Sequence, residues 1–406
     1  MDKISRLSDD LLVKILSFVP TRVAVSTSVL SKRWKSLWMW VPTLEYDDME
    51  DITDNYLSKS TPSFPRYRVS VHENLLSHRA PTIETLLLKF CLGSLQPEDI
   101  KQWVTIAVSR CVRALSITCL SDSEPVSALP SSLYTCETLA ALKLDGDRIL
   151  VDVPPTASRL PSLTTLQLLC VTYSDEDSLR LFLSYCPVLE DLVIERDSAD
   201  DNVKGLVVVV PSLLRFSLKV DGGCSYDDES VIDTPSLVYF KVEDYRDRDS
   251  NSYSIKDMPK LEEADIAVKY ELHVFLESVT SVKSLSIKVL FNNEEESMYC
   301  SCIVFNQLQR LKLSICNDDW SKLLFRLLKD SPKLRVLNLD CASRYRRFDE
   351  YDRISRDSEW SVIPNCLLKT LETFEFKGCM GRPEQRDFLC FFFKNARCLK
   401  STSILR

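Results

Sequence analysis

The stretch L-Q-R-L-K-L at residues 308–313 has leucine at its first, fourth and sixth positions. In an extended strand, alternate side chains point to the same side, so Leu311 and Leu313 share one face and Lys312 points to the other. The stretch L-R-V-L-N-L at 334–339 has the same pattern. One short strand cannot bury its own apolar face, so the recurrence of this unit predicts strands that stack on one another.

The pattern apolar-x-x-apolar-x-apolar occurs in thirteen copies from residue 83 onward. Nearly all copies begin 21 to 29 residues after the previous one, which is the spacing of leucine-rich repeats. A random apolar chain would match so loose a pattern at irregular intervals. The copy at 261 is weak, and in the copy at 399 Thr402 takes an apolar position. The copies begin at residues 83, 112, 139, 163, 189, 213, 237, 261, 282, 308, 334, 371 and 399.

Stacked repeats of this kind predict an α/β fold, an irregular leucine-rich-repeat solenoid with parallel strands on the concave face and helices or irregular segments on the convex face. Residues 320–329 and 178–185 have helical apolar spacing and predict return helices. The short polar returns of the copies from 213 to 261 predict extended or irregular segments. Few copies carry Asn or Cys at the ninth position, where Cys91, Cys316 and Cys379 lie, so the solenoid is expected to be irregular.

The composition is that of a folded protein, with 45% hydrophobic and 27% charged residues among 406. The net charge of −8 is unevenly distributed, because residues 1–42 hold seven basic and three acidic residues, a net +4, and the rest carries −12. A basic head attracts phosphates or an acidic protein partner. Nucleic-acid binding through the head is therefore one hypothesis, although a general nucleic-acid binder is usually basic as a whole.

The sequence lacks the motifs of common enzyme active sites. Seven glycines and three histidines occur, without a phosphate-binding glycine loop or a G-x-S-x-G or H-E-x-x-H motif. Cys300 and Cys302 lack the second pair that a zinc site requires. We therefore expect no enzyme activity, no metal and no cofactor. Fifteen scattered cysteines, polar residues 1–8 and the lack of a long apolar run predict a protein of the cytoplasm or nucleus, with reduced cysteines and no membrane span.

Residues 4–42 do not follow the repeat and predict three short helices. The first begins after Ser8, a suitable N-cap that two aspartates follow. Thr21 and Ser31 are the expected N-caps of the second and third helices. Trp34 and Trp38 are four residues apart and would share one face of the third helix. So small a core is marginal by itself and would gain stability from a partner.

The head resembles an F-box along residues 4–38, which read I-S-R-L-S-D-D-L-L-V-K-I-L-S-F-V-P-T-R-V-A-V-S-T-S-V-L-S-K-R-W-K-S-L-W. The family usually has Leu-Pro where this chain has Leu7-Ser8. The resemblance implies binding to a Skp-type adaptor, and through it to the cullin and RING subunits of an SCF ubiquitin ligase. Lys32, Arg33 and Lys35 would form a solvated flank that faces an acidic partner. The residues that the resemblance implies for adaptor binding are Leu7, Leu11, Leu12, Ile15, Leu16, Val19, Pro20, Leu30, Trp34, Leu37 and Trp38.

The C-terminal part is similar to the FBD domain, from Trp360 through L-E-T-F-E-F-K-G at 371–378 to N-A-R-C-L-K at 395–400. F-box, leucine-rich repeats and FBD in this order resemble the large plant F-box/FBD/leucine-rich-repeat family. The expected parts are an F-box at 1–45, a linker at 46–80, leucine-rich repeats at 81–341, a charged insertion at 342–359 and an FBD-like region that continues the solenoid at 360–406. The insertion is either a solvated loop or a docking segment.

These observations predict a substrate-recognition subunit of an SCF-type ubiquitin ligase, which binds a target protein on the concave face. The alternative is a leucine-rich-repeat scaffold or ligand-sensing protein that is not coupled to ubiquitination. The outward strand positions form either a solvated face or a site for a protein or a small ligand. The residues predicted to contact a target are Arg215, Lys219, Tyr239, Lys241, Glu243, Arg310 and Lys312.

Overall fold

The computed structural model describes residues 4–47, 64–90, 97–119, 127–147, 149–154, 159–197, 202–224, 228–246, 253–289, 303–315, 320–341 and 362–405. The chain divides into two compact units, Met1–Lys204 and Gly205–Arg406. The predicted charged insertion at 342–359 lies outside the described residues, as do Cys91, Cys300, Cys302 and Cys316. The predicted domain boundaries stay predictions.

The first unit begins with the helical head. It contains η1 (Ile4–Arg6), α1 (Asp9–Leu16), α2 (Thr21–Ser26), η2 (Thr27–Val29) and η3 (Leu37–Trp40), where η marks a 3-10 helix. The α-helix predicted to follow Ser31 is replaced by turns over 32–36 and by η3. Ser8 is the N-cap residue of α1, as predicted, but its side chain makes no cap hydrogen bond. The prediction for Thr21 is wrong: Pro20 is the N-cap of α2, and Thr21 lies inside the helix, where its hydroxyl accepts a 2.8 Å hydrogen bond from the backbone N–H of Glu45.

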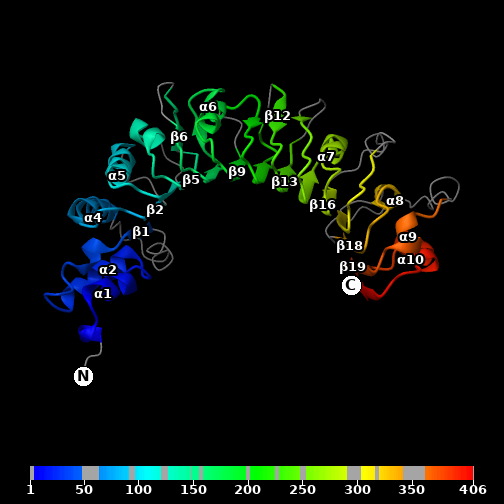
Figure 1. Cartoon of the computed structure of the whole chain (residues 1–406), viewed down its shortest axis with the longest axis horizontal. Helices are drawn as coiled ribbons and strands as arrows, with labels where there is room; N and C mark the ends of the chain where they lie inside the picture. The colour runs from blue at the N-terminus through cyan, green and yellow to red at the C-terminus, as the bar shows by residue number, and fades with distance from the viewer. Residues whose placement is uncertain are drawn as a thin grey trace. The chain divides into compact units, whose positions relative to one another are not determined.

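The head leads directly into a parallel sheet. The elements are β1 (Thr43–Asp47), α4 (Phe64–Ser77), β2 (Thr85–Phe90), α5 (Pro97–Ser109), β3 (Ala114–Cys119), β4 (Ser127–Ala128), η4 (Ser131–Thr135), β5 (Ala141–Asp145), β6 (Ile149–Val151), β7 (Thr165–Leu169), β8 (Thr172–Tyr173), α6 (Ser178–Ser184) and β9 (Asp191–Arg196). Within the described residues of this unit, the main sheet has the order β1-β2-β3-β5-β7-β9, and β4-β6-β8 form a small second sheet (Figure 1). Sequence reasoning missed β1, and it missed α4 within the segment expected to be a linker.

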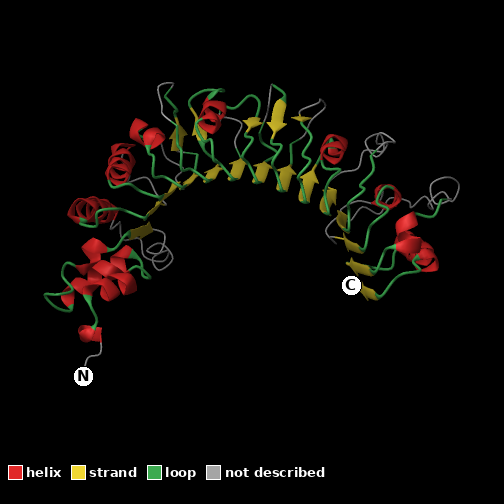
Figure 2. Ribbon diagram, in the orientation of Figure 1, coloured by secondary structure: helices red, strands yellow, loops and turns green. Residues whose placement is uncertain are grey.

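The second unit repeats this plan. Its elements are β10 (Val207–Val209), β11 (Arg215–Val220), β12 (Ser230–Asp233), β13 (Tyr239–Asp244), β14 (Tyr253–Ile255), β15 (Glu263–Val268), α7 (Leu272–Ser278), β16 (Ser284–Val289), β17 (Arg310–Ile315), α8 (Trp320–Lys329), β18 (Val336–Cys341), α9 (Asn365–Lys369), β19 (Thr373–Lys377), α10 (Pro383–Asn395) and β20 (Ser401–Ile404). The main sheet runs in the order β11-β13-β15-β16-β17-β18-β19-β20, and β10-β12-β14 form a small sheet. The helices of this unit all lie on one side of the main sheet (Figure 2). We call the other side of each main sheet its open face.

The repeats predicted that buried and outward-facing side chains alternate along each strand, and the structure confirms this. Leu311 pairs with Leu285 on one side and with Leu337 on the other, and all three are buried. The predicted return helices appear as α6 and α8, and the extended returns predicted for the copies at 213 and 237 contain β12 and β14. For the copy at 261 the prediction is wrong, because its return contains the helix α7. Aromatic rings extend the same ladder, because Phe216 and Phe240 stack at paired positions with centroids 5.7 Å apart. The core of each unit therefore lies between the main sheet and its return segments.

The head is attached to the repeats by hydrogen bonds as well as by the chain. The Met39 carbonyl accepts bonds from the backbone N–H groups of Arg79 and Ala80, at 2.7 and 3.1 Å. The buried His78 ring contacts the Val41 carbonyl through Nε2 at 2.8 Å, and the Arg110 guanidinium donates to the carbonyls of Ala80 and His78. Burial lowers the pKa of His78, and the nearby Arg110 charge adds to this effect, although the Val41 bond opposes it. His78 is therefore neutral in the folded state at neutral pH.

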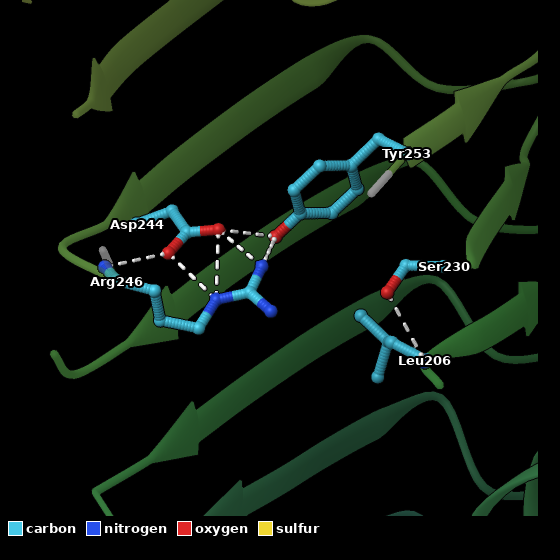
Figure 3. Close-up of polar contacts among 5 residues, drawn as sticks. All are labelled: Leu206, Ser230, Asp244, Arg246 and Tyr253. Carbon is cyan, nitrogen blue, oxygen red and sulfur yellow. Dashed lines mark hydrogen bonds and ion pairs between the residues drawn. The ribbon is translucent and has the colours of Figure 1, made fainter. Parts of the chain in front are cut away.

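A buried polar cluster fixes the end of β13 (Figure 3). Asp244 forms an ion pair with Arg246; the side chain of Asp244 is only 10% exposed and that of Arg246 only 1%. The Tyr253 hydroxyl at the start of β14 donates to Asp244 Oδ2 at 2.8 Å and accepts from Arg246 Nη2 at 2.9 Å. The ring of Tyr253 packs on Phe275 of α7, with centroids 4.9 Å apart. The cluster thus connects the main sheet, the small sheet and a return helix.

Two glycines with nearly the same positive φ test how closely adjacent repeats pack. Gly378 and Gly381 have φ of +71° and +70°. A Cβ on Gly378 would lie 2.2 Å from the Cys341 carbonyl oxygen, whereas one on Gly381 would meet no atom within 4 Å. We expect Gly381→Ala to cost about 1 kcal/mol through φ strain alone. Gly378→Ala should cost about 1–3 kcal/mol more because the backbones must separate. Equal urea midpoints for the two variants would contradict this.

The Asp244 cluster predicts a large loss of stability when one partner is removed. Asp244→Asn would leave the Arg246 charge buried without its counter-ion, at a cost of about 3–5 kcal/mol. Glu262→Gln is the matched control, because it breaks the exposed Lys283–Glu262 pair and should change stability by about 0.5 kcal/mol at most. Urea unfolding followed by circular dichroism measures both changes. Comparable shifts for the two variants would exclude a special role for the cluster.

His78 predicts a pH dependence of stability in the first unit. Since its pKa is lowered in the folded state, the unfolded chain binds a proton that the folded chain does not. Its stabilising contribution should therefore be complete above the unfolded pKa of about 6.5 and should fall as the pH drops below that value. The measurement is the stability difference between the parent and His78→Asn from pH 8 to pH 5. A difference that stays constant over that range would contradict the prediction.

Candidate functional site

The head has a very small core. Its buried side chains come from α1, α2 and η3 and from the residue that follows η3. Leu7, Val19 and Trp34 are partly buried and pack against this core. Trp34 and Trp38 thus share one core, as their spacing suggested, although no α-helix joins them. The buried core residues are Leu12, Leu16, Ala24, Leu37, Trp38 and Val41.

The same head exposes large apolar side chains. On α1, Leu12 and Leu16 point into the core, whereas Leu11 and Ile15, also four residues apart, point to solvent. The exposed apolar residues have accessible fractions between 45% and 87%. Exposed apolar groups gathered on so small a unit are typical of a protein-interaction site. They are Ile4, Leu11, Ile15, Phe18, Val23, Val29, Leu30 and Trp40.

The structure separates the predicted adaptor residues into three groups. Leu12, Leu16, Leu37 and Trp38 are buried in the head. Leu7, Val19, Pro20 and Trp34 are partly exposed, and Leu11, Ile15 and Leu30 are exposed, with accessible fractions of 45–65%.

Five exposed apolar residues of the head were not among the predicted adaptor residues: Ile4, Phe18, Val23, Val29 and Trp40. Phe18 lies seven residues after Leu11, so the helical spacing of α1 could have identified it.

Arg33 differs from the solvated flank that was expected. Its guanidinium donates to Asp9 Oδ1 from Nε at 2.7 Å and also to the Leu7 carbonyl. It therefore ties the turns before η3 to the start of α1. Lys32 and Lys35 are exposed, as expected. The side chain of Arg33 thus has a structural role that spacing alone did not reveal.

The predicted target residues all project from the open face of the second unit. Arg215, Arg310 and Lys312 are exposed, and Lys219, Tyr239, Lys241 and Glu243 are partly buried. They belong to β11, β13 and β17, so they do not form one continuous cluster. The structure therefore distributes the predicted set over separated strands of the sheet.

Within this face, Lys241 and Glu243 form an ion pair of 2.8 Å. The hydrogen bond to Glu243 raises the pKa of Lys241. Burial acts to raise the pKa of Glu243, but the bond and charge of Lys241 outweigh it, and the pKa is lowered. Burial and the Glu243 charge raise the pKa of Tyr245, whose hydroxyl donates to Glu243 Oε2 at 3.1 Å. These three side chains satisfy one another.

Three of the cysteine thiols that the structure describes are unsuited to act as nucleophiles. Burial raises the pKa of Cys186 and Cys366 to about 12, and burial together with nearby carboxylates raises that of Cys170 to about 12. Because the thiolate is the reactive form, these groups are inert at neutral pH.

Among the residues that the structure describes, no group of three or more His, Cys, Asp or Glu side chains is placed to hold a metal ion. No helix in the described part of the chain combines the length and apolar character needed to cross a membrane.

Models of known families match three parts of the chain. An F-box domain model matches residues 4–46, and an FBD model matches residues 359–404. A model of the leucine-rich repeats of the FBD-associated F-box protein At5g56370 matches residues 100–303. The matches follow the order head, repeats and C-terminal region.

Whole-length relatives occur in Arabidopsis thaliana. The FBD-associated F-box protein At5g60610 is 52% identical over 405 residues, which cover 100% of both chains. The putative FBD-associated F-box protein At5g56700 is 56% identical over 407 residues, covering 100% of this chain and 98% of the relative. The putative FBD-associated F-box protein At5g56690 is 53% identical over 408 residues, 100% of both. The chain therefore belongs to the family of FBD-associated F-box proteins with leucine-rich repeats.

Proposed function

We propose that this chain is the substrate-recognition subunit of an SCF-type ubiquitin ligase. Residues 1–45 would bind a Skp-type adaptor, and the open faces of the repeats and the FBD-like region would bind a target protein. Membership of the F-box family supports the first part. The observation that carries the proposal is the set of exposed apolar side chains on the head, above all Leu11, Ile15 and Phe18.

The chemistry of the α1 surface suits an adaptor with apolar and acidic groups. Leu11, Lys14 and Ile15 follow one another at helical spacing on α1, and Phe18 lies in the turn after the helix, so a cation lies among three apolar side chains. Burial of each apolar side chain against a partner would contribute about 1.5–3 kcal/mol. Lys14, together with the exposed Lys32 and Lys35, would favour acidic residues at the rim.

The other predicted adaptor residues either support this surface from inside the head or contact the adaptor at its edge. The buried Leu12, Leu16, Leu37 and Trp38 support the surface from inside and do not touch the adaptor. Leu7, Val19, Pro20, Leu30 and Trp34 border it and supply part of the contact.

The chain would promote ubiquitination by proximity. It needs no reactive group, because the cullin and RING subunits would bring the charged ubiquitin donor. Holding the target on the same complex raises the effective concentration of its lysines at that donor. The raised thiol pKa values and the mutually satisfied polar groups of the open face fit this passive role.

Substitution of the two exposed apolar residues of α1 tests the adaptor site. We expect Leu11→Asp and Ile15→Asp each to weaken binding of a purified Skp-type adaptor at least about 30-fold, because a charge would enter an apolar interface centre. Biolayer interferometry measures the affinity. Circular dichroism should show that the variants remain folded, since both side chains are exposed and lie outside the buried core of the head.

Leu76→Asp is the matched control, because Leu76 of α4 is also an exposed leucine, 62% accessible, outside the head. It should leave adaptor binding unchanged. Full adaptor binding by Leu11→Asp and Ile15→Asp would refute the ligase proposal and favour the alternative, a scaffold or ligand-sensing protein that is not coupled to ubiquitination.

A further inference from the structure

The outward positions of two adjacent strands carry only cations and hydroxyls. Strand β16 presents Ser284, Ser286 and Lys288 to the open face, and β17 presents Arg310, Lys312 and Ser314. In the parallel register each cation pairs with a serine: Arg310 with Ser284, Lys312 with Ser286, and Lys288 with Ser314. We call these six residues the β16–β17 basic patch; the two strands follow β15 in the second unit (Figure 1).

The three cations of the patch differ from other lysines on the open faces. Lys143 pairs with Asp145, Lys241 with Glu243, and Lys377 with Glu375. Lys288, Arg310 and Lys312 are exposed and have no ion-pair partner among the described residues. The Lys288 ammonium lies 5.9 Å from the centroid of the Tyr245 ring. The patch therefore holds positive charge that the fold does not neutralise.

Acidic residues border the patch on both sides. Glu263 and Asp265 of β15 pair with Ser284 and Ser286, and Asp340 of β18 pairs with Ser314. The chain as a whole carries a net charge of −8. A polyanion that covers a wide surface would meet this negative rim, so nucleic acids and anionic membranes fit poorly. An anionic ligand narrow enough to cover only β16 and β17 would contact the cations and not the carboxylates on the neighbouring strands.

The spacing of the cations suits carboxylates on an extended peptide. Alternate residues of a strand lie about 6.7 Å apart, which separates Arg310 from Lys312, and adjacent strands lie about 4.8 Å apart, which places Lys288 about 8 Å from Lys312. Alternate side chains of an extended peptide have the same separation of about 6.7 Å. Two carboxylates at such positions can therefore reach Arg310 and Lys312 together, while the serine hydroxyls donate hydrogen bonds to the same oxygens.

We propose that the β16–β17 basic patch binds an acidic peptide segment of the target protein, with carboxylates at alternate positions paired to Arg310 and Lys312 and a further one paired to Lys288. This inference rests on the proposed function, because it names the class of target that the open face would hold. It adds Lys288 and three serines to the predicted contact residues.

Peptide binding by the full chain tests the patch. The probe is a short fluorescein-labelled peptide with glutamate at alternate positions, and its control has glutamine there. We expect the glutamate peptide alone to bind, with an affinity that falls as salt is added. Combined Lys288→Ser, Arg310→Ser and Lys312→Ser substitutions should reduce its affinity at least about tenfold in a fluorescence-anisotropy titration.

A second triple variant controls for net charge. Lys89→Ser, Lys143→Ser and Lys377→Ser also remove three positive charges from open faces, but these lysines are already paired. It should retain peptide binding. An equal loss in both triple variants, no difference between the two peptides, or equally tight binding of phosphatidylserine vesicles or of a single-stranded oligonucleotide would overturn the proposal.

Adaptor binding, measured on the same samples, distinguishes the two proposals. The patch variant should bind the Skp-type adaptor as well as the parent does, and Leu11→Asp should bind the acidic peptide as well as the parent does. If the parent binds the peptide but not the adaptor, the ligase proposal fails and the patch proposal stands. If it binds the adaptor but not the peptide, the patch proposal fails alone.

Discussion

The register between parallel strands is the constraint on which the rest of the molecule depends. Leu285, Leu311 and Leu337 meet across three strands because each ladder keeps buried positions opposite buried positions. A shift of one residue would turn every core side chain of a strand toward water. The side chains between them must therefore project to the open face whatever their chemistry. Core and binding surface thus alternate residue by residue, and the binding surface can change without altering the core.

The repeats could be predicted because their signal is local and recurs. Each copy contains its own apolar spacing, and thirteen copies reinforce one register. The strand β1 was missed although Val41, Leu44 and Tyr46 have the same spacing and are all buried, because it lies next to the head. The third α-helix predicted for the head is replaced by turns and η3, since Arg33 and Trp34 are held by contacts with α1 and with the core that no sequence window contains.

The candidate sites were predictable only in part, for a physical reason. Along α1, Leu11 and Leu12 are equally apolar, and only the packing of α2 and η3 decides which of them is buried. On the open face, the strand positions of Arg310 and Lys312 followed from the repeat. The proximity of Lys288 depends on the register between β16 and β17, which spans more than twenty residues of sequence. Lys241 has an ion-pair partner, whereas Lys312 has none among the described residues, and this difference likewise depends on the folded chain.

The strand β1 belongs to the head and to the sheet at once. Its five residues pair with β2, and its backbone also bonds to Thr21 of α2. Rotation of the head about this strand would require a whole ladder to break, so the connection lacks a hinge. Any protein bound to the head would therefore have a fixed orientation relative to the first repeats. In a ligase, such a rigid connection would mean that the position of a lysine on the bound target, more than the reach of a flexible linker, determines which lysine is modified.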